Sequence, residues 1–382
     1  TVRLNTWRAV REVIAKSSLG FGEAYTRGDI DVDGDLQSLA LLSFRARERR
    51  LRGAFAERLS YAVGLLGRRN TLSGSKRNIA AHYDLDNDFY RLWLDEEMQY
   101  TCAYFAEPTD TLEDAQRRKM DLVCRKLDLK PGELVVEAGG GWGGLALHMA
   151  RHWGVRVRSF NISKNQIAFA RERAERLGIP TDRLEYVHDD YRSIPAHVGA
   201  CDKFASICML EHVGRENYPT LRKVIGEVVR EPGLALLQFI SRTRPAPTSN
   251  PWLEKHVFPG YYNPSLAEVA RTVEAPGSGL QIVDVENMRY HYALTLRHWL
   301  ERFEANAETV TAHWGEAVVR TFRLYLNGGL ADFTQGGGTL VFQALIARGA
   351  DNAAPLTRRR FIEAAEAEAD VADRPAPVFA RA

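Results

Sequence analysis

The 382-residue chain lacks three features that would each place it in a class of proteins. No apolar run is long enough to span a bilayer, and no charged-then-apolar leader opens the chain. The four cysteines are dispersed, without a CxxC pair or a histidine at metal-binding spacing. We therefore expect no membrane-spanning helix, no disulfide framework and no metal site, and a reducing cytoplasm as the location.

Net charge is also small, at +2 for the whole chain, but it is unevenly distributed. Residues 1–77 hold 15 lysines and arginines against 8 acidic residues, with five arginines from Arg45 to Arg52 and two more at Arg68 and Arg69. Few aromatic residues lie among them, and no nucleic-acid motif accompanies them. We expect an anionic membrane surface as partner, hence peripheral association, and no nucleic acid, although a solvated helix face explains any single arginine equally well.

The most informative segment that is present is VVEAGGGWGGLALHMA, residues 135–150, in which an apolar strand ends in an acid and a glycine turn opens a helix. Gly139 and Gly141 allow the backbone to turn sharply and to approach a ligand where a Cβ would collide. Glu137 lies at the carboxyl end of the strand, where open α/β sheets bind ligands. The segment therefore predicts a nucleotide-type cofactor.

Two cofactors fit the glycine spacing. The dinucleotide reading also requires an acid about 20 residues further on, at the end of the next strand, for the ribose. Asn161, Ser163 and Gln166 stand there instead. The segment therefore favours S-adenosylmethionine over NAD.

Strands and helices alternate through the rest of the chain, which predicts an α/β fold with a doubly wound, mostly parallel sheet. A helix is expected over about 111–127. The expected strands are Leu134–Glu137, Arg156–Phe160, Leu184–His188, Phe204–Met209, Gly233–Ile240 and one within 335–349.

The chain divides by composition into three expected parts. The N-terminal part begins with a short strand, a helix with Trp7, Val10 and Val13 or Ile14 on one face, and a Gly/Asp-rich turn region. From Leu36 to Leu66 it continues mostly as helix. The three parts are a small, mainly helical, lipid-facing domain over 1–72, a catalytic domain over 73–350 and a polar C-terminal tail over 351–382, with 71–78 as the linker. The segment 241–252 is either a mobile lid or a surface connection.

Six ordered blocks resemble the cyclopropane-fatty-acid synthase family, which includes the mycolic acid cyclopropane synthases. They are His82–Phe105, Glu137–Ala146, Asp189–Arg192, Met209–Thr220, Trp252–Leu266 and His291–Asn306. The resemblance runs from near residue 18 to about 349. It implies the seven-stranded sheet of class I methyltransferases with a small helical N-terminal domain. It also implies transfer of a methyl(ene) group from S-adenosylmethionine to the cis double bond of a phospholipid acyl chain, forming a cyclopropane.

The resemblance also implies the residues of the site. In this family the base is thought to be a bound bicarbonate, and the matching positions that hold it are Cys102, Glu211, Ile240 and Tyr292. The cofactor is expected to lie along Tyr100, Thr101, Glu137, Gly139 and Gly141, with Gln166 at the ribose and Asp190 and Tyr191 around the adenine. Asn161 is a further expected member of the cofactor site. Glu211 has a simpler interpretation as a helix cap or as a partner of His212.

Gln238 stands where the family pattern has histidine. An amide can hold an oxyanion, but it cannot take or relay a proton near neutral pH. A methyltransferase that gives a methylene or methyl-branched product therefore remains an alternative to the cyclopropane synthase. A catalytically idle lipid-binding protein is disfavoured by the retained site residues. Gly140 and Leu210 also depart from the family, and we interpret both as packing changes. Whether the chain forms a homodimer stays open.

Overall fold

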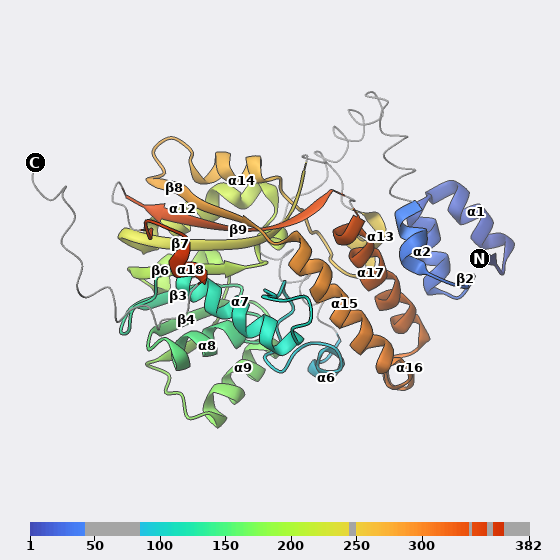
Figure 1. The fold of residues 1–382 in the computed structure, drawn as a ribbon, viewed down its shortest axis with the longest axis horizontal. Helices are drawn as coiled ribbons and strands as arrows, with labels where there is room; N and C mark the ends of the chain where they lie inside the picture. The colour runs from blue at the N-terminus through green and yellow to red at the C-terminus, as the bar shows by residue number, and fades with distance from the viewer. Residues whose placement is uncertain (43–84, 244–249, 336–337, 350–353, 363–382) are drawn as a thin grey trace, which may run out of the picture.

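The structure is a computed structural model, and it describes residues 1–42, 85–243, 250–335, 338–349 and 354–362. Its largest element is a seven-stranded sheet in the order β5-β4-β3-β6-β7-β9-β8 (Figure 1). Strands β3 to β7 are parallel, and β9 is antiparallel to both of its neighbours. The predicted doubly wound, mostly parallel α/β sheet is therefore confirmed. The strands are β3 (Leu134–Ala138), β4 (Arg156–Asn161), β5 (Leu184–His188), β6 (Cys201–Ile207), β7 (Val229–Arg242), β8 (Leu280–Asn287) and β9 (Thr339–Arg348).

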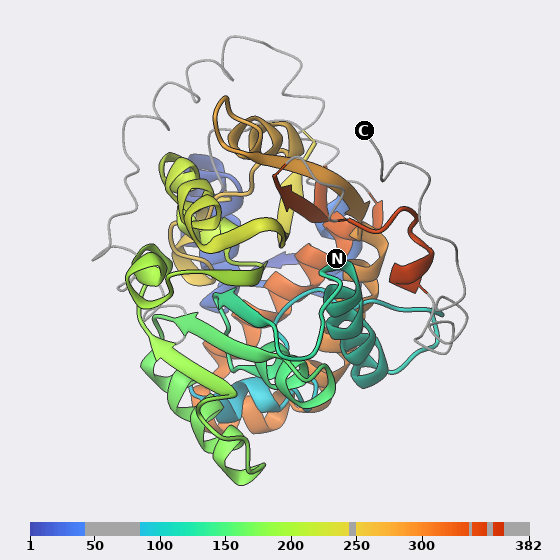
Figure 2. The ribbon, with the colours of Figure 1, turned by 90° about the vertical axis from the view of Figure 1, so that its left-hand side faces the viewer.

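Helices cover both faces of this sheet because successive apolar residues of each strand point to opposite sides. Val135 packs into the core beneath one set of helices, and its neighbour Val136 packs beneath the other. One set comprises α7 (Leu112–Lys126), α8 (Gly144–His152) and α9 (Lys164–Arg176). The other comprises α10 (Ile194–His197), α12 (Tyr218–Val228) and α14 (Leu266–Val273), as Figures 1 and 2 show.

An aromatic core lies beside the sheet, between it and the N-terminal residues. Phe89, Trp93, Trp299 and Phe322 meet there with ring centroids 4.7 to 6.0 Å apart, mostly edge to face. These rings come from elements far apart in the chain. They are α6 (Asn87–Arg91) with the turn after it, which carries Trp93, α15 (Arg289–Ala305) and α17 (Glu316–Gln335), to which α16 (Ala307–Trp314) is joined. The remaining short elements are η1 (Tyr191–Ser193), α11 (Leu210–Val213), η2 (Arg215–Asn217), α13 (Pro251–His256) and α18 (Arg359–Ile362).

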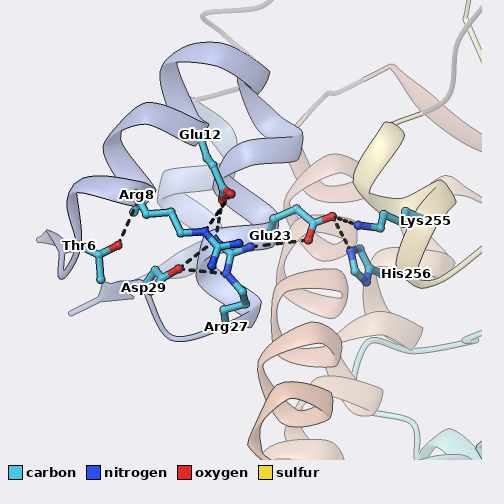
Figure 3. Close-up of polar contacts among 9 residues, drawn as sticks. Thr6, Arg8, Glu12, Glu23, Arg27, Asp29, Lys255 and His256 are labelled. Carbon is cyan, nitrogen blue, oxygen red and sulfur yellow. Dashed lines mark hydrogen bonds and ion pairs between the residues drawn. The ribbon is translucent and has the colours of Figure 1, made fainter.

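The first residues form a small unit of two helices, α1 (Trp7–Lys16) and α2 (Ser18–Thr26), and an antiparallel pair, β1 (Val2–Leu4) and β2 (Ile30–Val32). Arg320 of α17 donates to the Tyr25 and Ile30 carbonyl oxygens, each at 2.5 Å. Glu23 of α2 accepts from Lys255 and His256 of α13, as Figure 3 shows. The unit is thus attached to α13 and α17 by charged contacts.

Several bounds differ from the sequence predictions. The strand predicted at 204–209 runs from Cys201 to Ile207, because Cys208 has a positive φ of 54° that ends the extended conformation. The predicted Gly/Asp-rich turn region contains β2, which pairs with β1. Strand β8 was not located by its pattern, since its exposure does not alternate strictly.

The expected apolar face of the first helix is also corrected. Helix α1 buries Ala9 and packs Val13 against the small N-terminal core, as expected for Val13, whereas Trp7 and Ile14 are 79% and 80% exposed. Residues 36–42 are helical, as predicted for the start of the mostly helical stretch from Leu36 to Leu66. The arginine cluster, the expected linker at 71–78, the boundary at 72, part of the segment 241–252 and most of the tail lie outside the described residues.

Candidate active site

The glycine turn between β3 and α8 has the backbone conformation that its residues suggest. Gly139, Gly141 and Gly143 have φ values of 84°, 53° and 81°, which side-chain-bearing residues rarely adopt. The Gly139 N–H donates to the Phe160 carbonyl of β4 at 2.8 Å. A Cβ at Gly141 would meet no atom within 4 Å. The turn is therefore held against β4 and leaves open space beside Gly141.

Asn161 and Gln166 lie next to this turn, from the end of β4 and the first turn of α9. Asn161 Nδ2 donates to the Gly141 carbonyl at 3.0 Å and to Gln166 Oε1 at 2.9 Å. Gln166 Nε2 is buried, and within the described residues it has no hydrogen-bond partner. A buried donor without a partner costs free energy, so the position fits a ligand oxygen such as a ribose hydroxyl.

Glu137 is buried beneath the turn, at the end of β3. Burial raises the pKa of Glu137 to about 7, although the Ser159 hydroxyl and the Lys119 charge oppose the shift. Ser159 Oγ donates to Glu137 Oε2 at 2.6 Å. A Cβ at Gly140 would overlap Ser159 Oγ and crowd Glu137 Oε2. Glycine at position 140 therefore leaves the space that the Ser159–Glu137 hydrogen bond occupies.

Lys119 of α7 is a site residue that the sequence prediction missed. Its Nζ is fully buried and donates to Thr101 Oγ1 at 3.0 Å and to Gln99 Oε1 at 2.5 Å. Burial lowers the pKa of Lys119 to about 8, while nearby Asp95 favours the charged form most. The only signal in the sequence is its place on the buried face of the predicted helix 111–127. The lysine fixes the segment that carries Tyr100 and Thr101.

Tyr100 belongs to the aromatic core. Its hydroxyl donates to the Tyr325 hydroxyl at 3.2 Å, and its ring centroid lies 5.2 Å from Trp93 and 5.3 Å from Trp299. Burial raises the pKa of Tyr100 well above its ordinary value, so this phenol is neutral. Tyr100 thus joins the segment that Lys119 holds to the aromatic core.

Asp190 and Tyr191 follow β5, which β4 separates from the glycine turn on β3. Asp190 Oδ1 accepts from the Arg192 N–H at 3.0 Å, and the Arg192 guanidinium lies 5.2 Å from the Tyr191 ring centroid. Both residues are buried. They lie at the same carboxyl-end edge of the sheet as the other cofactor candidates, two strands away from the glycine turn on β3.

Glu211 is buried in α11, directly after the loop that follows β6. Its Oε1 accepts from the Ile240 N–H of β7 at 2.5 Å, so its carboxyl group contacts a strand. Burial raises the pKa of Glu211 to about 7, and the Ile240 N–H opposes this most. For Oε2, no donor among the described residues meets hydrogen-bond geometry. One carboxyl oxygen is therefore bound at the strand edge, and the other, with the Cys208 thiol close to the carboxyl group, has no hydrogen-bond partner among the described residues.

Gln238 and Cys208 meet at the carboxyl ends of β7 and β6. Gln238 is 0% exposed, and its Nε2 lies 3.6 Å from Cys208 Sγ. Burial raises the pKa of the Cys208 thiol well above its ordinary value, and the nearby Glu211 adds to this. Sequence reasoning counted Cys208 only as a dispersed cysteine, although it directly precedes the block that contains Glu211.

Cys102 and Tyr292 complete this group from two further segments. The Met288 carbonyl accepts from the Tyr292 N–H at 3.1 Å and from Cys102 Sγ at 3.7 Å. Burial raises the pKa of Tyr292 well above its ordinary value, and Cys208, Cys102 and Glu211 are close enough to raise it further. The structure therefore brings together the predicted residues Cys102, Glu211, Gln238, Ile240 and Tyr292, around Cys208.

Comparison with known families gives two matches along the chain. The family described as mycolic acid cyclopropane synthetase matches residues 71–343. A domain of unknown function, DUF7884, matches residues 1–54. A probable fatty acid methyltransferase of Pseudomonas putida is 39% identical over 264 residues, which are 68% of this chain and 66% of that protein. The chain thus spans just under two thirds of that relative's length.

Two further relatives extend the comparison. The cyclopropane-fatty-acyl-phospholipid synthase of Escherichia coli K12 is 33% identical over 350 residues, which are 91% of this chain and 88% of that protein. A mycolic acid cyclopropane synthase solved in complex with SAH (S-adenosylhomocysteine) and CTAB matches with a TM-score of 0.66 at 28% identity. That match covers 72% of this chain and 98% of the solved chain.

Proposed function

Since the chain belongs to the mycolic acid cyclopropane synthetase family and is an S-adenosylmethionine-dependent methyltransferase, we propose that it forms cyclopropane rings in unsaturated phospholipid acyl chains. The methyl(ene) group would come from S-adenosylmethionine and would be added to a cis double bond. One observation carries the proposal: the buried carboxyl of Glu211, with Oε2 free, lies in one group with Cys102, Gln238 and Tyr292.

S-adenosylmethionine supplies an electrophilic methyl group when it is bound. On the protein side, the free Gln166 Nε2 and the open space at Gly141 support the assignment of its ribose and methionine parts to the glycine turn. Glu137 would remain a structural acid beneath the turn, because Ser159 already occupies its Oε2. Asp190 and Tyr191 are proposed for the adenine, since a carboxylate can accept from the adenine amino group and a flat aromatic ring can pack against the base.

The aromatic core suits an alkene substrate. An isolated alkene is a weak nucleophile, so it must be aligned with the methyl donor, and water must be kept from the cation that forms. Trp93 and Trp299 are fully buried beside Tyr100, and Tyr292 contacts Trp299 at 5.9 Å between ring centroids. We propose that these faces exclude water and stabilise the positive charge.

Ring closure requires removal of a proton, and bicarbonate would supply the base when bound. Glu211 Oε2, Tyr292 and Gln238 are the groups that would hold it. A carboxyl group whose pKa is about 7 is partly protonated near neutral pH, so Glu211 can donate to an anion as well as accept from it. The Ile240 N–H already donates to Glu211 Oε1, so its role would be to orient that carboxyl.

The second candidate is a C-methyltransferase that leaves an open-chain methylene or methyl-branched product. Gln238 favours it, because an amide in the family's histidine position does not relay a proton. The Pseudomonas relative, named a probable fatty acid methyltransferase, supports it too.

Mass spectrometry of the lipid products separates the two candidates. The protein is incubated with vesicles of a cis-unsaturated phospholipid and methyl-labelled S-adenosylmethionine, and the product is treated with ozone. Ozone cleaves a residual C=C bond but not a cyclopropane ring. Ring formation is expected to give a labelled, ozone-resistant acyl chain that is heavier than the substrate chain by one CH2. Label only in cleaved fragments, or a labelled ozone-resistant chain that is heavier by CH4 and therefore carries a saturated methyl branch, would establish the second candidate. Unlabelled lipid would contradict both.

We also propose that the N-terminal part, residues 1–72, rests on an anionic membrane surface beside a catalytic part, 73–350, and a polar tail, 351–382. Trp7 and Ile14 are exposed on α1, two helical turns apart, with Arg11 between them in sequence. Aromatic, aliphatic and basic side chains on one helix suit a lipid interface. Among the described helices, none has the length and apolarity to span a membrane.

A further inference from the structure

A row of buried polar side chains crosses the sheet and ends at the candidate site. Glu286 of β8 is directly opposite Gln343 of β9, which is directly opposite Gln238 of β7. Gln343 and Gln238 are both 0% exposed. Buried polar groups cost free energy unless they are paired, so a row of this kind inside a sheet core calls for an explanation.

The row is joined by hydrogen bonds that all run in one direction. Lys126 of α7 is 1% exposed, and its Nζ donates to Glu286 Oε2 at 2.5 Å and to Gln343 Oε1 at 2.9 Å. Gln343 Nε2 donates to Gln238 Oε1 at 2.8 Å. Gln238 Nε2 then lies 3.6 Å from Cys208 Sγ.

The lysine decides which way both amides point. An ammonium group has only donors, so the atom of Gln343 beside it must be the oxygen. The amide nitrogen of Gln343 then faces Gln238. Gln238 must therefore accept this hydrogen bond with its side-chain oxygen. Burial lowers the pKa of Lys126, but the Glu286 carboxylate opposes this and favours the charged form. The N–H groups of Gln238 are thereby directed toward Cys208 and the site.

We propose that Lys126, acting through Gln343, holds Gln238 as a hydrogen-bond donor to an oxyanion at the reaction site. A thiol is a weak acceptor, and its contact occupies at most one of the two amide N–H groups. Gln238 therefore binds an anion and does not accept a proton. Lys126 and Gln343 are positioning residues. The inference rests on the proposed function for the identity of the anion, which is bicarbonate.

Two near-isosteric variants test the orientation. Gln343→Glu keeps an acceptor for Lys126 but offers Gln238 only an acceptor, so Gln238 must turn its oxygen toward the site. Gln343→Met removes the contact and imposes no orientation. Gln281→Glu, at an exposed position of β8, is the control for added negative charge on the sheet.

Bicarbonate affinity is measured without substrate, from the rise of Tm with bicarbonate concentration at constant ionic strength and mildly alkaline pH. We expect the Kd to increase slightly in Gln343→Met and by about tenfold or more in Gln343→Glu, because a hydrogen bond to a charged group is replaced by repulsion. Both Gln343 variants are expected to bind S-adenosylmethionine with the wild-type Kd. The control Gln281→Glu is expected to bind bicarbonate with the wild-type Kd.

Two results would overturn the inference. One is a Gln343→Glu protein that binds bicarbonate as well as or better than Gln343→Met. The other is a wild-type protein that binds no bicarbonate. The proposed function fails by a different result, the absence of labelled lipid in the product assay, which leaves the order of the bicarbonate affinities unaffected.

Discussion

The buried carboxyl of Glu211 makes a specific prediction about stability against pH. Its pKa is raised from 4.5 to about 7 by burial. Between these values the folded protein binds more protons than the unfolded chain, so the free energy of unfolding falls as pH rises. A shift of this size corresponds to about 3 kcal/mol, as an order of magnitude, at 1.36 kcal/mol for each pKa unit. The stabilising contribution of the protonated form is complete below about pH 4.5 and lost above about pH 7.

The perturbation is Glu211→Gln, which keeps an oxygen to accept from the Ile240 N–H but cannot ionise. We expect this variant to lose about 3 kcal/mol of the decline in unfolding free energy between mildly acidic and neutral pH. Glu137, whose pKa is also raised to about 7, should retain its own contribution. The assay is urea unfolding at several pH values, without cofactor.

Glu172→Gln is the matched control, since Glu172 is an exposed residue of α9. Its pH profile should coincide with that of the wild type. A Glu211→Gln profile parallel to the wild-type profile would refute the reasoning, because it would mean that Glu211 ionises in the folded protein as it does in the unfolded chain.

Three further predictions concern the cofactor, the chemistry and the membrane. Calorimetry should detect binding of S-adenosylmethionine and of its demethylated product but not of NAD, and Gln166→Leu should weaken that binding by about tenfold through loss of one hydrogen bond; tight NAD binding would contradict the assignment. Glu211→Ala should abolish ring closure in the product assay, and Gln238→His should keep or raise the cyclopropane yield; a ring yield unchanged by Glu211→Ala would exclude its role. Trp7→Ser should weaken binding to anionic vesicles by about tenfold or more, since a large apolar side chain loses its contact with lipid, whereas turnover of a dispersed short-chain substrate should change little; equal vesicle binding would argue against α1 as the contact.

The parts of the site that sequence predicts well are those determined by local backbone constraints. Glycines at 139 and 141 mark a turn that needs positive φ, and the strand before them is apolar on both faces because it is central in a parallel sheet. Thr111 caps α7 where the pattern predicts its start. Short-range sterics and hydrogen bonding are sufficient for such features, so the sheet, its order of elements and the cofactor turn follow from the pattern and the resemblance.

The parts that sequence missed depend on contacts between distant segments. Gln238 is a candidate from the sequence alone, but its row with Gln343 of β9 and Lys126 of α7 depends on the strand register and on the packing of α7 against the sheet. Lys119 looks like one more charged residue of an amphipathic helix until the fold buries it against Thr101. The place of Cys208 likewise depends on the end of β6 beside β7.

The sequence by itself determined the α/β sheet, the glycine turn and the residue types available at the carboxyl ends of the strands. Each of these depends on the local pattern of apolar residues and on backbone preferences. Tertiary structure alone decided which polar side chains are buried, which of them are paired, and that Glu211 Oε2 and Gln166 Nε2 have no hydrogen-bond partner within the described part of the chain. The physical reason is that burial and hydrogen bonding are properties of the packed molecule, set by residues up to hundreds of positions apart.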